Sequence, residues 1–116
     1  MIYLANAFSL KMLPKRLMPA HVHVYEMSLA EAKKAISTAG EWTSAVGHAD
    51  TAAVIGEQLG VEVPCNRINV SLGEGDMLIV AQLYGDRLPE GVTKLPENSN
   101  IEYLLVKVIY RCRPKK

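Results

Sequence analysis

The sequence has little that could cross-link a small protein. Its 116 residues include two cysteines, Cys65 and Cys112, which lie far apart and form no CxxC pair or Cys/His zinc spacing. No secretory signal precedes them, so we expect reduced thiols in a cytoplasmic protein. No apolar run approaches the length of a membrane span, so we expect no membrane partner.

Aromatic residues and net charge are also scarce. Phe, Trp and Tyr make up 6% of the chain, and the formal net charge is +1. A charge this small argues against a protein that binds DNA through many phosphate contacts, although one pocket can be locally positive. The sequence lacks a P-loop, a GxGxxG motif and the carboxylate cluster of two-metal enzymes, so we expect neither a metal nor a cofactor.

What is present is an ordinary globular composition, 49% hydrophobic and 22% charged, which fits a single domain over residues 1–116. Apolar patterning predicts an α/β fold with a mixed sheet of about five strands and helices packed mainly on one face. The predicted strands are Ile2–Asn6, Ala20–Met27, Asn66–Leu72, Met77–Tyr84 and Ile101–Arg111. The last strand is apolar on both faces, which favours self-association along that strand and hence a homodimer.

The strand at residues 20–27 alternates with period two. Val22 and Val24 share one face, and His21, His23 and Tyr25 share the other, which predicts a strand with one buried face. Two histidines on one face also form a potential metal pair. Without a third ligand nearby, a solvent-exposed face is the better interpretation.

The connections are predicted from glycine and proline. Glu41–Val46 reads as a short extended segment, and Gly73–Asp76 as the hairpin turn between Asn66–Leu72 and Met77–Tyr84. Gly85–Asn100 contains prolines, glycines and scattered charge, which is typical of a functional or disordered loop.

Both predicted helices have start and stop signals. Ser28 and Glu31 form a capping box, and Gly40 ends the first helix. Asp50 or Thr51 is expected to cap the second helix, which Gly60 ends. Ser9 is a further capping residue, for a brief helical turn that Pro14 stops.

The chemically active side chains collect on two loops. His48 follows Gly47 at a loop-to-helix junction, and Arg87 and Glu90 lie in the segment Arg87-Leu88-Pro89-Glu90-Gly91. An imidazole, a fixed cation and a carboxylate are the groups needed for proton transfer beside a phosphate. Each also has a simpler interpretation, because a loop histidine often only packs or caps, and an arginine and a glutamate often pair on a surface.

Four further polar residues are candidates for ligand contacts. Asn6 and Ser9 follow a strand and either reach a ligand or cap the turn, and Arg67 and Gln82 are polar positions among apolar ones. The helix start near Asp50 offers unpaired N–H groups to a phosphate. The residues alone indicate a nucleotide-phosphate site.

Four blocks of the sequence resemble one protein family. They are similar, in order and spacing, to the motifs of the viral-type ring nucleases: Tyr3–Leu10 with Met12-Leu13, Gly47-His48 with Thr51, Asn66-Arg67, and Arg87–Gly91. If the chain is viral, the resemblance implies that it acts in the host cytoplasm. This family was first met as archaeal-virus anti-CRISPR proteins against type III systems. The resemblance implies a homodimer that binds cyclic tetra-adenylate across its interface, cuts it without metal into linear di-adenylates, and so switches off type III signalling.

The resemblance also implies roles for individual residues. His48 would be the general acid for the departing ribose 5′-oxygen, Arg87 would stabilise charge on the phosphate, and Glu90 would position His48. The attacking group would be the ligand's own 2′-hydroxyl, which leaves a 2′,3′-cyclic phosphate. Phosphates and adenines would be held by Asn6, Ser9, Arg67 and Gln82. Two alternatives remain open: a non-catalytic protein that sequesters a cyclic nucleotide, and a structural protein whose last strand is an interaction surface.

Overall fold

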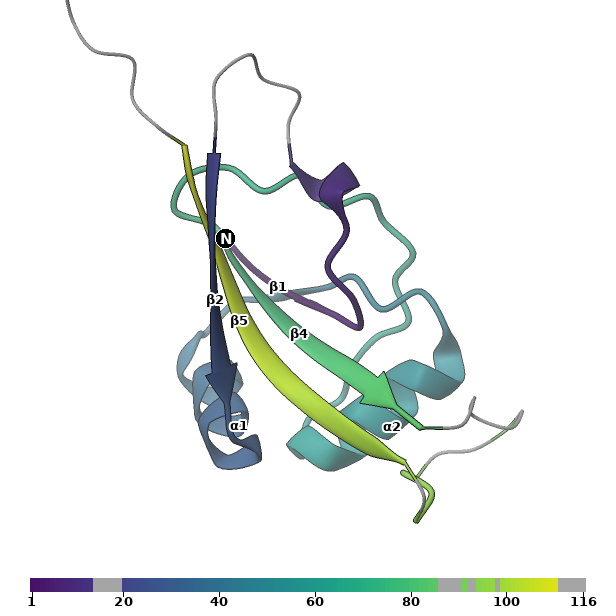
Figure 1. Cartoon of the computed structure of the whole chain (residues 1–116). Coiled ribbons are helices and arrows are strands. Elements are labelled where there is room, and N and C mark those ends of the chain that lie inside the picture. Colours follow the sequence, from purple (N-terminus) through teal and green to yellow (C-terminus); the bar gives the residue numbers. More distant parts are fainter. Residues whose placement is uncertain (14–19, 86–90, 92–93, 98, 111–116) are drawn as a thin grey trace, which may run out of the picture.

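One mixed five-stranded sheet, with strand order β2-β5-β4-β1-β3, and two helices on one of its faces form the molecule (Figure 1). The computed structural model describes residues 1–13, 20–85, 91, 94–97 and 99–110, so Arg87, Glu90 and Cys112 lie outside the described residues. The elements are β1 (Ile2–Ala5), the 3-10 turn η1 (Leu10–Met12), β2 (Ala20–Met27), α1 (Leu29–Thr38), β3 (Thr43–Ser44), α2 (Ala49–Leu59), β4 (Met77–Tyr84) and β5 (Asn100–Tyr110). The predicted α/β class, the mixed sheet and the placement of the helices are confirmed. Within the described residues, neither helix is long and apolar enough to cross a membrane.

The sheet has two unequal hydrophobic cores. On the helix side, α1 and α2 bury Ile36, Ile55 and Leu59 against β1, β4 and β5. Neither α-helix of the described residues lies on the opposite face. The segments around η1 and residues 70–72 cover part of it instead.

The strand predicted at Asn66–Leu72 does not form, and the hairpin to β4 was therefore a wrong prediction. Both edges of β4 are already paired, with β1 in parallel and with β5 in antiparallel fashion. Residues 66–72 instead cross the second face of the sheet, where Val70 and Leu72 are buried. The fifth strand is β3, which pairs with β1 and lies inside the predicted extended segment Glu41–Val46.

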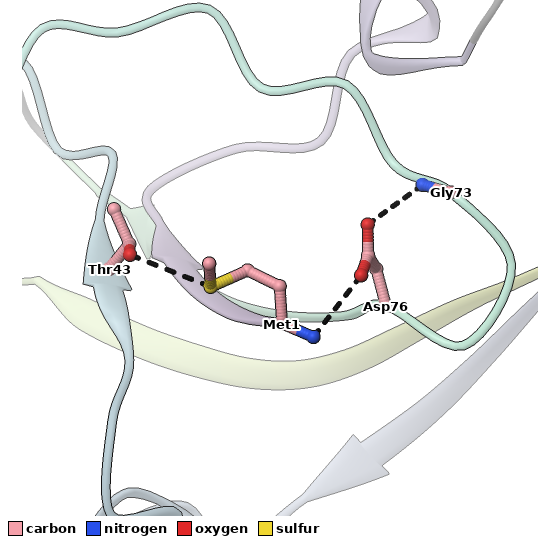
Figure 2. Close-up of polar contacts among 4 residues, drawn as sticks. All are labelled: Met1, Thr43, Gly73 and Asp76. Atoms are coloured by element: carbon pink, nitrogen blue, oxygen red, sulfur yellow. Dashed lines mark hydrogen bonds and ion pairs between the residues drawn. The ribbon is translucent and has the colours of Figure 1, made fainter.

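The turn at residues 73–76 leads from this crossing segment into β4. Asp76 Oδ2 accepts a hydrogen bond from the N–H of Gly73 at 2.8 Å, and Oδ1 lies 3.2 Å from the amino group of Met1 (Figure 2). The hydroxyl of Thr43 contacts the sulfur of Met1 at 3.7 Å. These contacts fasten the starts of β1, β3 and β4 together.

The prediction of one buried face for β2 was also wrong. Val22 and Val24 are 36% and 54% exposed, and His21 and His23 on the other face are exposed as well. The reason is the position of β2 at the edge of the sheet, beyond both cores, so that only Met27 at its end packs against the helix-side core. The described part of the chain leaves the apolar face of β2 exposed.

The last strand has the predicted two apolar faces. Ile101 and Tyr103 belong to the helix-side core, while Val106 and Val108 belong to the other. Since β5 lies between β2 and β4, its own edges are not available for self-association.

Burial and the carboxylate of Glu57 raise the pKa of Tyr103 to about 12.

The capping box of α1 is confirmed. Ser28 Oγ accepts from the N–H of Glu31 at 3.1 Å, and Glu31 Oε1 accepts from the N–H of Ser28 at 2.9 Å. The bond from the N–H of Ser28 to the ionised carboxylate, helped by the Ser28 hydroxyl, lowers the pKa of Glu31. Gly40, just after the helix, has φ +73°, the left-handed conformation expected of a glycine that ends a helix.

Gly56 in α2 provides a test of the packing. A Cβ at this position would lie 2.7 Å from the carbonyl oxygen of Val61 and 3.3 Å from the N–H nitrogen of Val63. Helix propensity favours alanine over glycine by about 1 kcal/mol, but a backbone carbonyl cannot move aside cheaply. We therefore expect Gly56→Ala to lower the free energy of unfolding by roughly 1–2 kcal/mol in urea denaturation.

The matched control for Gly56→Ala is Ala30→Ser, a small change at an exposed position of α1. It should alter the free energy of unfolding by less than about 0.5 kcal/mol. A Gly56→Ala protein as stable as the wild type would show that the loop at Val61 yields freely.

Candidate functional site

The site predicted from the sequence lies where three parallel strands end. β1 pairs in parallel with both β3 and β4, so the carboxyl ends of all three strands meet at one edge of the sheet (Figure 1). Asn6 follows β1, residues 45–48 follow β3, and Gly85 follows β4. In open α/β sheets this edge is where ligands bind.

The loop between β3 and α2 is fastened to the segment that contains Arg67. The hydroxyl of Ser44 donates to the carbonyl of Pro64 at 2.6 Å, and the side-chain amide of Asn66 donates to the carbonyl of Ser44 at 2.7 Å. The backbone N–H of Asn66 donates to the carbonyl of Val46 at 2.8 Å. Two segments some twenty residues apart in the sequence are thus fixed side by side.

This pairing puts Arg67 against Gly47. A Cβ on Gly47 would lie 3.5 Å from Arg67 Nε and 3.6 Å from its Cβ and Cγ, so the arginine stem passes over the glycine. Arg67 is exposed, and among the described residues it forms no ion pair. A guanidinium without an ion-pair partner in the described segments therefore lies next to the residue that precedes His48.

His48 is the N-cap residue of α2. Its φ and ψ are −120° and 130°, and its side chain makes no capping hydrogen bond. The prediction that Asp50 or Thr51 caps this helix was wrong by two or three residues, because α2 begins at Ala49. The imidazole of His48 is exposed, and it does not occupy the first N–H groups of the helix. This end of α2 is open to an anion.

Asp50 has a different function from capping. Its Oδ2 accepts a hydrogen bond from the N–H of Gly91 at 3.0 Å, across forty-one positions of the chain. Gly91 is the last residue of the Arg87–Gly91 motif. The two loops that carry the predicted catalytic residues therefore approach each other at the start of α2. Whether Arg87 and Glu90 reach His48 stays a prediction, because both lie outside the described residues.

Two further predicted ligand residues, Asn6 and Gln82, lie near the ends of β1 and β4. Asn6 is half-buried directly after β1 and makes no hydrogen bond within the described part of the chain. Gln82 is half-buried near the end of β4, opposite Glu102, and its amide makes a long 3.4 Å contact with the carbonyl of Leu83. Both therefore lie at the same edge of the sheet as His48 and Arg67.

Ser9 has the capping role that was its simpler interpretation. Its hydroxyl accepts from the N–H of Lys11 at 3.2 Å and begins η1. The side chain is exposed, so its second lone pair is open to a ligand.

Two other regions offer less to a phosphate ligand. A groove of about 590 Å³ runs beside α2, but its charged lining residues are Glu57 and Glu62, which repel anions. His21 and His23 lie on β2, at the other end of the strand order.

Among the described residues, no group of three or more His, Cys, Asp and Glu is arranged to hold a metal ion. Cys65 is an exposed free thiol.

Similarity to known proteins identifies the family of the chain. Residues 2–106 match the family model described as STIV B116-like. The chain belongs to the STIV B116-like family. Uncharacterized protein 26 of Sulfolobus islandicus filamentous virus (isolate Iceland/Hveragerdi) is a relative, 34% identical over 91 residues, which cover 78% of this chain and 74% of that protein. Relatives of the STIV B116-like family thus include proteins of viruses that infect Sulfolobus.

The same fold occurs in a solved structure. B116 of Sulfolobus turreted icosahedral virus superposes with a TM-score of 0.75 at 22% sequence identity, covering 91% of this chain and 97% of that one. At this identity the likeness establishes the fold alone.

Proposed function

We propose that this member of the STIV B116-like family is a metal-independent ring nuclease. It binds cyclic tetra-adenylate at a homodimer interface and cleaves it to linear di-adenylates with 2′,3′-cyclic phosphate ends, which switches off type III CRISPR signalling. One observation carries the proposal: the hydrogen bond from Gly91 to Asp50 joins the motif that contains Arg87 and Glu90 to the helix that begins after His48.

The proposed reaction is a transesterification. The 2′-hydroxyl oxygen of the ligand attacks its neighbouring phosphorus and loses its proton to water, while the bond from phosphorus to the 5′-oxygen breaks. His48 gives a proton to that leaving oxygen. Attack within the ligand needs alignment more than an activated water, so a proton donor and a cation supply the main requirements. Arg87 stabilises the negative charge that develops on the phosphate, and Glu90 positions the imidazole.

The described residues support binding of an anionic ligand at this edge. Arg67 offers a guanidinium that has no carboxylate partner among the described residues, and the open start of α2 offers N–H groups and a positive dipole end. Asn6 and Gln82 add amide groups, which suit phosphate oxygens and base edges. These groups compensate for a net charge of only +1.

The dimer forms, in this proposal, through the sheet face that carries no helix. Val22 and Val24 are exposed there, and the register puts them opposite Val108 and Val106 of β5. Gln82 points to this same face, because side chains two residues apart on β4 share it with Val80. A second copy on this face would thus bring two sites together, which suits a ligand with two-fold symmetry.

The direct test is to incubate the purified chain with cyclic tetra-adenylate in EDTA and to identify the products by chromatography and mass spectrometry. We expect linear di-adenylate with a 2′,3′-cyclic phosphate, and light scattering should give twice the mass of one chain. Intact ligand that stays bound would support a sequestering protein instead. Absence of binding would support a structural interaction protein and reject both nucleotide proposals.

A further inference from the structure

We infer that Asp50 is a positioning residue for cleavage, which holds Gly91, the last residue of the Arg87–Gly91 motif, against the start of α2. This inference rests on the proposed function, and it adds a residue to which no role in the reaction was assigned from the sequence. The contact itself is the 3.0 Å hydrogen bond from the N–H of Gly91 to Asp50 Oδ2. The charged acceptor makes this bond stronger than one between neutral groups.

The residue at position 91 suits this contact. Gly91 has φ +82°, a backbone conformation that residues with a Cβ adopt only under strain. A glycine here lets the chain turn so that its N–H faces the carboxylate of Asp50. Glu90 immediately precedes Gly91 in the sequence, so the bond to Asp50 acts on the residue next to the proposed partner of His48.

Asp50 is not assigned to the ligand itself, because a carboxylate repels a phosphate. It lies in the first turn of α2, the one part of a helix where a negative side chain is favoured by the dipole. The carboxylate is therefore stabilised by its own helix while one of its oxygens serves Gly91. A single side chain thus connects the first turn of α2 to Gly91.

The experiment compares Asp50→Ala and Asp50→Asn with the wild type. Amide hydrogen exchange without ligand measures the contact, and single-turnover cleavage of saturating cyclic tetra-adenylate measures its consequence. We expect Asp50→Ala to speed exchange at Gly91 and to lower the cleavage rate by about 10- to 100-fold, the range for a lost hydrogen bond to a charged group. Asp50→Asn keeps an acceptor oxygen and should retain cleavage within about threefold of the wild type.

Asp76→Ala is the matched control. Asp76 also accepts from the N–H of a glycine, Gly73, at 2.8 Å, but at the start of β4, the opposite end from the site. It should lower thermal stability and leave both exchange at Gly91 and cleavage unchanged. The control therefore separates a local effect of Asp50 from a general loss of stability.

The outcomes that overturn the inference differ from those that overturn the proposed function. Unchanged exchange at Gly91 in Asp50→Ala, unchanged cleavage, or a loss in Asp50→Asn as large as that in Asp50→Ala would each reject the positioning role. A wild-type protein that does not cut cyclic tetra-adenylate would reject the proposed function, and the exchange data would still report whether the contact exists.

Discussion

Replacing His48 with alanine should lower the rate of cleavage by about 10²- to 10⁴-fold, the contribution of a well-placed general acid. Without the imidazole, the 5′-oxygen must leave as an alkoxide, which is a poor leaving group. Binding should change little, because the phosphates are held by the arginines and by the start of α2. Single-turnover kinetics with saturating ligand, together with a filter-binding measurement, separate the two effects.

The control for His48 is His21→Ala. His21 is likewise exposed, on the helix-side face of β2, away from the site and from the face assigned to the dimer. It should cleave at the wild-type rate. If His48→Ala also cleaved at that rate while still binding the ligand, the proton would have to come from another group and the proposed mechanism would fail.

Replacing Arg87 with alanine should have the second largest effect, a loss of about 10²- to 10³-fold in cleavage rate. This is the range for removing one preorganised group that meets developing transition-state charge. Arg87→Lys should recover only part of the loss, because lysine keeps the charge but not the planar pair of donors. The rates are measured at saturating ligand, so that weaker binding does not contribute.

Arg67→Ala is the informative comparison for Arg87. Arg67 lies against Gly47 at the start of the helix and is assigned to binding. Its loss should weaken affinity and leave the rate at saturation within a few-fold of the wild type. A reversed pattern, with Arg67 controlling the rate and Arg87 only the affinity, would exchange the two assignments and contradict the proposed role of Arg87.

Local sequence signals predicted those features that depend on neighbouring residues. The capping box at Ser28 and Glu31 formed as predicted, because its bonds join groups three positions apart. Gly40 and Gly60 ended their helices with positive φ for the same local reason. The edge strand β2 and the long strand β5 were found from their β-branched, alternating residues.

Sequence patterns were misleading where the outcome depends on which distant segment packs or pairs with the residues. Residues 66–72 have the composition of a strand, yet β1 had taken the edge of β4 that a hairpin requires. Val22 and Val24 alternate as a half-buried strand does, yet no described part of the chain covers them. Asp50 looked like a cap, and only the fold brought Gly91 within reach of it.

The sequence by itself determined where α1 starts, where both helices stop, most of the strands, and which residue types are available for chemistry. Those properties follow from residue propensities and from hydrogen bonds between residues a few positions apart. Such local interactions do not depend on the tertiary fold. The tertiary structure decided that Arg67 lies beside Gly47 and that the Gly91 loop meets the start of α2. Contacts across twenty to forty residues depend on strand order and parallel pairing, and these are set by competition among all segments for the same sheet edges.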